Sequence, residues 1–125
     1  MPSRWHATLF DTARYSGTIA VETTEGSGIG ATSAYLERME RATHMTACLF
    51  DSAGNPIAGS DCSSFQGMTS HVEASQSPDF SMKYGIARAA LLLKGQSGRD
   101  YIFATELPAG PRAALGINHA AVLLQ

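Results

Sequence analysis

Residues 34–61, AYLERMERATHMTACLFDSAGNPIAGSD, contain the change of periodicity that decides the fold. In the first half the apolar residues recur at the spacing of one helix face, and Glu37 precedes Arg41 by four positions, so their side chains can pair. From Met45 onward the pattern changes to short apolar alternation with β-branched and aromatic residues, which favours a strand over 46–50. The stretch therefore predicts a helix that leads almost directly into a strand.

The second half of this stretch has the composition of a tight turn and a returning strand. The side chain of Asp51 can accept hydrogen bonds from the backbone that follows it, and Gly54 and Asn55 tolerate a positive φ. Pro56 has no N–H to donate, so it belongs at the start or edge of a strand over 57–59. A helix followed by an antiparallel hairpin opens many small sensory α/β domains, but this pattern alone indicates no chemistry.

The remaining residues predict an α-α-β-β-α-β-β-α order within one domain spanning 1–125. Before the decisive stretch we expect a helix near 5–20, a glycine-rich loop over 22–30 and a helix over 31–43. After it, the capping-box pattern at Ser70 predicts a short helix over 71–75. Strands are predicted over 84–94 and 100–107, joined by a glycine-bounded loop, and a final helical stretch over 113–124.

The charge composition argues against nucleic acid as a partner. The net charge is −2, and the nine lysines and arginines are scattered rather than gathered in a patch. The longest apolar run, 89–93, is far shorter than the roughly 20 residues that span a bilayer. No signal peptide is visible, so the chain is expected to be either a soluble domain or a piece from between two membrane helices.

The two cysteines, Cys48 and Cys62, are not expected to be within easy reach of each other. A hairpin turning near Gly54 places Cys48 opposite Gly59, which leaves Cys62 about three positions further along. At about 3.3 Å per residue, this offset favours one buried thiol and one loop thiol. A disulfide is left open as the alternative, and the cellular compartment bears on it as much as the geometry does.

The residues that carry chemistry form no recognisable catalytic, metal or cofactor motif. The four histidines are isolated from one another in separate predicted elements: His6, His44, His71 and His119. The GSGIG sequence at 26–30 precedes a helix but lacks the lysine and hydroxyl residue of a phosphate loop. We therefore expect no metal and no cofactor, and a small enzyme using His71, Glu73 and Arg88 is a minor hypothesis.

A ligand site is predicted around Arg88, which interrupts an apolar strand. A planar guanidinium projecting from a sheet can recognise an anionic ligand. Lys83, Tyr84 and Tyr101 lie close by in the predicted hairpin and complete the candidate ligand-binding set. The alternative is that Arg88 lies on the solvent face or extends past the sheet edge.

Three motifs resemble one family when taken together. They are AYLERMERATHM at 34–45, ACLFDSAGNPIAG at 47–59 and GRDYIFATELPAGP at 98–111. In this order and at these distances they resemble the extracytoplasmic sensor domains of bacterial membrane-bound sensor histidine kinases, the two-component receptors with a HAMP segment. His44 and Met45, which stand where that group often has Thr-Gly-Ile, and the two cysteines depart from its pattern.

The resemblance implies an α+β, PAS-like sensor domain in which long N-terminal helices pack on one face of an antiparallel sheet. It implies a periplasmic part of an inner-membrane protein, with membrane helices at both ends, and no enzymatic activity in this chain. An unidentified small-molecule or protein signal would shift the packing of helices on the sheet and so control a cytoplasmic kinase and its phosphorelay.

The resemblance also implies a homodimer. Trp5, Leu9, Ala13 and Ser16 are the expected helix–helix seam, although the same stripe could instead pack on its own sheet. The alternative to the receptor reading is a stand-alone PAS-like or roadblock-like interaction module in the cytosol.

Overall fold

The computed structural model describes residues 2–108, with side chains from Leu9 to Leu107. Two helices come first, α1 (Pro2–Ser27) and α2 (Ile29–Thr43), followed by the hairpin β1 (Thr46–Asp51) and β2 (Pro56–Gly59). A 3-10 turn, η1 (Cys62–Phe65), leads into α3 (Gln66–Ser75). The chain then forms β3 (Asp79–Lys83), β4 (Ile86–Lys94) and β5 (Asp100–Pro108). The predicted final helix over 113–124 lies outside the described residues.

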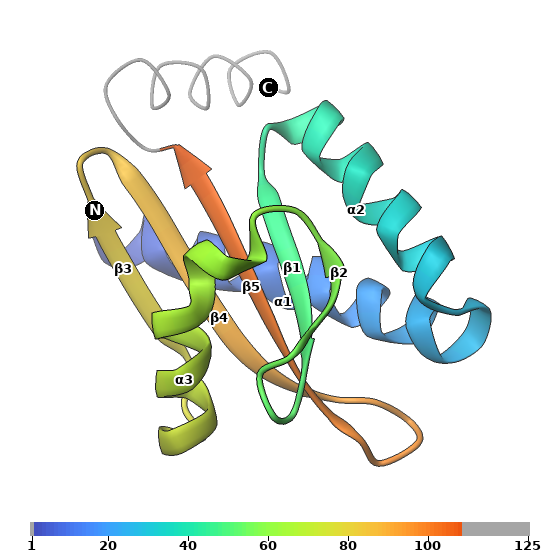
Figure 1. Cartoon of the computed structure of the whole chain (residues 1–125). Helices are drawn as coiled ribbons and strands as arrows, with labels where there is room; N and C mark the ends of the chain where they lie inside the picture. Colours follow the sequence, from blue (N-terminus) through green and yellow to red (C-terminus); the bar gives the residue numbers. More distant parts are fainter. Residues whose placement is uncertain (1, 109–125) are drawn as a thin grey trace.

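The five strands form one antiparallel sheet in the order β2-β1-β5-β4-β3. The long helices α1 and α2 pack against one face of this sheet, and α3 covers part of the other face (Figure 1). The predicted α+β class, with long N-terminal helices on one face of an antiparallel sheet, is confirmed. The arrangement is consistent with the PAS-like fold that the resemblance implies.

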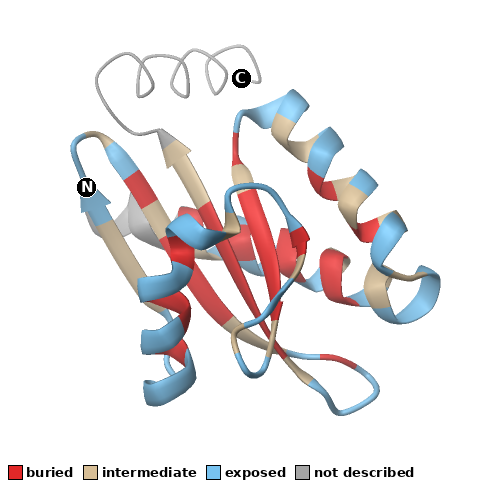
Figure 2. Ribbon diagram, in the orientation of Figure 1, coloured by how far each residue is buried: buried red, intermediate tan, exposed pale blue. Residues whose placement is uncertain are grey.

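Two apolar layers hold the helices to the sheet. The alternation of β1 and β5 sends Leu49 and Phe103 toward α1 and α2, and sends Cys48 and Ile102 toward α3. The most buried residues accordingly run along the central strands, whereas the outer surfaces of α2 and α3 are exposed (Figure 2). A central strand that is buried on both faces has a continuous run of apolar residues instead of an alternating pattern. For this reason the LLL run of β4, residues 91–93, has a composition that a helix could also have.

The predicted hairpin after α2 is confirmed in register and in turn chemistry. Cys48 pairs with Gly59, and the Asp51 carboxylate accepts hydrogen bonds from the backbone N–H groups of Ala53 and Asn55 at 3.0 and 2.9 Å. His44 ends α2 in the left-handed conformation. The strands predicted over 84–94 and 100–107 correspond to β4 and β5.

The predicted loop over 22–30 is wrong, because α1 continues to Ser27 and only Gly28 interrupts the helices. The Thr24 hydroxyl donates to the Ala20 carbonyl within α1 and lies 2.6 Å from the hydroxyl of Thr32, which is fully buried in α2. Packing between the two helices therefore keeps a glycine-rich segment helical despite its weak intrinsic propensity.

Two further local predictions fail around α3. The helix begins at Gln66 rather than near His71, so Ser70 lies inside it and forms no capping box. Strand β3 was not predicted, because its short segment lies at the sheet edge and carries little apolar patterning.

The cysteines are bonded to each other, which corrects the prediction of two separate thiols. Cys48 and Cys62 form a disulfide with their Cα atoms 5.6 Å apart. The expected offset assumed that the chain continues straight beyond β2. Instead, positive φ values at Gly59 (122°) and Asp61 (55°) turn the chain back toward β1. An added Cβ at Gly59 would lie 2.3 Å from the Ala47 carbonyl oxygen, so this return requires glycine.

Helix α1 packs closely on the sheet at Gly17. An added Cβ there would lie 2.6 Å from Leu93 Cδ1 and 2.9 Å from the Phe103 ring. Glycine lowers helix propensity by about 1 kcal/mol relative to alanine, but at Gly17 it permits this close approach. Among the described residues, no helix has the length and apolar character needed to cross a bilayer.

Candidate functional site

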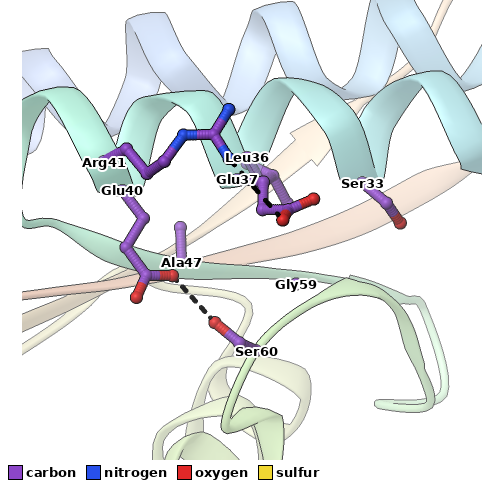
Figure 3. A pocket seen from close by; sticks show the side chains of 8 residues that line it. All are labelled: Ser33, Leu36, Glu37, Glu40, Arg41, Ala47, Gly59 and Ser60. Atoms are coloured by element: carbon purple, nitrogen blue, oxygen red, sulfur yellow. Dashed lines mark hydrogen bonds and ion pairs between the residues drawn. The ribbon is translucent and has the colours of Figure 1, made fainter.

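A groove of about 490 Å³ lies between α2 and the β1–β2 hairpin. It is lined by residues of α2, residues of the hairpin, and the residue that follows β2: Ser33, Leu36, Glu37, Glu40, Arg41, Ala47, Gly59 and Ser60 (Figure 3). Leu36 and Ala47 form part of the buried core at its base.

Charged and hydroxyl groups line the mouth of this α2 groove. The Arg41 Nη1 atom lies 3.8 Å from Glu37 Oε1, which confirms the predicted pairing along the helix (Figure 3). The Ser60 hydroxyl donates to Glu40 Oε1 at 3.0 Å and so bridges the hairpin to α2 (Figure 3). Both ionic side chains of the Glu37–Arg41 pair are largely exposed, so the pair itself contributes little to stability. The groove offers carboxylates, a guanidinium and hydroxyls together, which can accept hydrogen bonds from a polar molecule and donate hydrogen bonds to it.

The end of α1 is tied to the β4–β5 loop by Glu25. Its carboxylate accepts hydrogen bonds from the Ser97 backbone N–H at 3.1 Å, from the Ser97 hydroxyl, and from the Tyr101 hydroxyl at 2.9 Å. A side chain on Gly95 would collide with this carboxylate, at 2.3 Å from Oε2. These contacts, here called the Glu25 latch, connect helix α1 to the far end of the central hairpin.

The latch changes the acid–base properties of both groups. Hydrogen bonds from Ser97, followed by that from Tyr101, lower the pKa of Glu25 below its usual 4.5. Burial, followed by the hydrogen bond to Glu25, raises the pKa of Tyr101. Both shifts favour the ionised carboxylate beside the neutral phenol.

The stability of the protein should therefore depend on Glu25 in acid. Because the folded-state pKa is depressed, the contribution is complete above the ordinary value of 4.5 and is lost as the pH falls through the folded value. We expect the melting temperature of the wild type to exceed that of Glu25→Gln near neutral pH and to converge on it as the pH falls well below 4.5. Differential scanning fluorimetry across pH measures this, with Glu22→Gln as control. An unchanging gap between the wild type and Glu25→Gln would contradict the assignment.

Arg88 joins the sheet to the segment after β2. Its Nε donates to Glu106 Oε1 at 2.7 Å, its Nη1 donates to the Ser64 carbonyl at 3.0 Å, and its guanidinium lies 5.5 Å from the centre of the Phe65 ring. The guanidinium therefore packs against η1 rather than pointing freely into solvent.

Three of the four predicted ligand-binding residues lie together, and the fourth does not. Lys83, Tyr84 and Arg88 share a groove of about 230 Å³ with Ser81 and Ile86. Tyr101 belongs to the core layer under α1, on the opposite face of the sheet, and donates to Glu25. The period-2 alternation of β5 explains the separation, because Glu106 and Tyr101 point to opposite faces.

The residues of the predicted dimer seam pack within the protomer. Leu9, Ala13 and Ser16 are 3%, 0% and 6% exposed against the sheet and α2, so they have no surface to offer a second copy. The structure shows the alternative, in which this stripe packs on its own sheet. An amphipathic helix buries its apolar stripe on the nearest sheet. The side chain of Trp5 lies outside the described residues.

Two residues of the enzyme hypothesis, His71 and Glu73, do not face each other. His71 and Glu73 are exposed and two positions apart on α3, so the helix does not direct them toward each other. Within residues 2–108 there is no group of three or more histidine, cysteine, aspartate or glutamate side chains that could hold a metal ion.

The α2 groove and the Glu25 latch were not predicted from the sequence. Ser33, Glu37 and Glu40 follow the helix spacing of one face, so a polar stripe beside the buried Leu36 was visible in principle. Nothing in the sequence indicated which strand this stripe would face. Comparison with known proteins finds no matching family model and no matching curated protein.

Proposed function

We propose that this chain is the signal-sensing input domain of a two-component sensor histidine kinase. It binds or responds to a signal outside the cytoplasm and passes the change through flanking membrane helices to a cytoplasmic kinase. The chain itself performs no catalysis in this proposal, and its partners are the signal, a second copy and the membrane that anchors the parent protein.

The observation that carries this proposal is that α1 begins and β5 ends at the same end of the fold (Figure 1). Leu9, near the start of α1, packs with Ala87 of β4, and Ile86 pairs with Pro108 at the end of β5. A domain inserted between two membrane helices needs this geometry, because both connections must return to one membrane.

The helices are placed to carry a signal. Both α1 and α2 pack on the same face of the sheet, and the α2 groove opens between α2 and the hairpin. A molecule that binds there with different affinity for two positions of α2 shifts the balance between them. The hydroxyl contact of Thr24 with Thr32 and the Glu25 latch then connect α2 to α1, and α1 to the β4–β5 loop.

The disulfide favours an extracytoplasmic location over a cytosolic interaction module. Disulfides persist in the bacterial periplasm and are rare in the reducing cytosol. A fusion of alkaline phosphatase after Gln125, with all of the native chain that precedes it retained, distinguishes the extracytoplasmic sensor from the cytosolic module. The phosphatase is active only where disulfides form. Phosphatase activity is expected, and an inactive fusion at normal protein level would reject the receptor proposal.

Transmission can be tested in a chimera in which residues 1–125 replace the extracytoplasmic domain of a sensor kinase with a known target promoter. Removing the latch by Glu25→Gln should change promoter output at least about fivefold, the lower end of typical coupling between sites. Glu22→Gln lies in the same helix and should leave output unchanged. Equal output from the wild type and both variants would show that the latch carries no signal.

A further inference from the structure

The turn between β3 and β4 exposes an unusual set of side chains. Tyr84 is 98% exposed, Met82 is 50% exposed and Ile86 is 37% exposed. Tyr84 and Gly85 form the two-residue connection, both with positive φ (51° and 74°). Such turns favour asparagine, aspartate or glycine at the first position, so a tyrosine is costly there for the fold itself. Folding therefore does not explain this tyrosine.

The turn lies at the end of the molecule where α1 begins and β5 ends (Figure 1). Ile86 pairs with Pro108, the last residue of β5, and Phe80 of β3 packs against Phe10 of α1 with ring centres 6.0 Å apart. If α1 and β5 both connect to membrane helices, as the proposed function requires, this turn faces the bilayer surface.

The groove beside the turn has a cationic character. Its charged lining residues are Lys83 and Arg88, of which Arg88 is paired with Glu106. None of the ion pairs among the described residues involves Lys83, which is exposed. Tyrosine places an apolar ring and a polar tip at the level of lipid headgroups, and lysine is attracted to anionic lipids. The hydroxyl of Ser81 adds a hydrogen-bonding group to the same groove.

From these observations we propose that residues 82–86 dock on the headgroup layer of an anionic phospholipid membrane, with Tyr84 inserted and Lys83 beside a lipid phosphate. This inference rests on the proposed function, because the membrane helices would hold the turn at the bilayer. The contact would fix the orientation of the β3–β4 hairpin while α1 and α2 move.

The test uses the 125-residue chain tethered through a C-terminal hexahistidine tag to nickel-chelating lipid in vesicles. Tethering raises the local concentration to the millimolar range, which a weak contact needs. Trp5, the one native tryptophan, is replaced by phenylalanine and Tyr84→Trp is introduced. Brominated phosphatidylglycerol should quench this tryptophan, whereas Tyr15→Trp, 71% exposed on α1, should remain unquenched. Ile86→Trp is a second reporter.

A second set of measurements tests whether the contact depends on the charge of Lys83 and of the lipid. Lys83→Gln, or vesicles of brominated phosphatidylcholine, should weaken binding of the turn to the membrane about fivefold, as expected for the loss of one basic residue's attraction to an anionic surface, and quenching should fall with it. Quenching of Tyr84→Trp and Ile86→Trp no greater than that of Tyr15→Trp would overturn the proposal. So would displacement by inorganic phosphate beyond the effect of sodium chloride at equal ionic strength, because the groove would then recognise free anions.

Failure of this inference can be told apart from failure of the proposed function. Absent quenching with an active phosphatase fusion rejects membrane docking alone. An inactive fusion rejects the receptor role, whatever the vesicles show.

Discussion

Replacing both cysteines with alanine is expected to lower the free energy of unfolding by about 3 kcal/mol. The bond joins residues 14 positions apart, and closing a loop of this size removes that much conformational freedom from the unfolded chain. Native packing adds to the loss, since Cys48 is fully buried beside Phe50 and Phe65, while Cys62 anchors the start of η1.

Urea unfolding of the wild type with and without dithiothreitol, beside Cys48→Ala/Cys62→Ala, measures the effect. The reductant should shift the wild-type midpoint toward that of the double variant and leave the double variant unchanged. If thiol titration shows complete reduction while the wild-type midpoint stays the same, the disulfide does not stabilise the fold.

Substituting Gly17→Val is expected to lower the free energy of unfolding by about 3 kcal/mol, near the upper end of typical overpacking costs. A Cβ at this position would already overlap Leu93 and Phe103, at 2.6 and 2.9 Å, and valine adds two methyl groups with little freedom to rotate in a helix. The helix must move outward or the buried Phe103 ring must leave its position.

Gly26→Val is the matched control, because Gly26 lies in the same helix with nothing within 4 Å of an added Cβ. It should change stability by less than about 1 kcal/mol, in the range of helix propensity. Chemical denaturation followed by circular dichroism compares the two variants. Equal stability of the two would mean that α1 does not approach the sheet as closely as the structure shows.

Comparison of the predicted elements with the observed ones shows which local sequence patterns were sufficient to specify structure. The alternation over 46–50, the Asp51 turn and the aromatic run in β5 each encode their structure in neighbouring residues, and all three were predicted. The extension of α1 to Ser27, the early start of α3 and the edge strand β3 were not predicted. Packing against distant residues decides these three elements.

In the candidate sites, too, contacts within one element were predictable and contacts between distant elements were not. The Glu37–Arg41 pair was predictable because both partners belong to one helix. The Glu25 latch joins residues 72 and 76 positions apart, and no local pattern signals such a contact. Tyr101 was grouped with Arg88 in one ligand site, although the two lie on opposite faces of the sheet. The faces of two strands can be compared only once their register is known.

By itself the sequence determined most of the order of helices and strands, and the β1–β2 hairpin with its register. These properties depend on composition, periodicity and turn chemistry, which act over a few neighbouring residues. Only the tertiary structure decided that Cys48 meets Cys62, that the apolar stripe of α1 is buried on its own sheet, and that Leu9 of α1 packs against β4. Each of these depends on where the chain turns back, and a few positive-φ residues such as Gly59 and Asp61 set that direction.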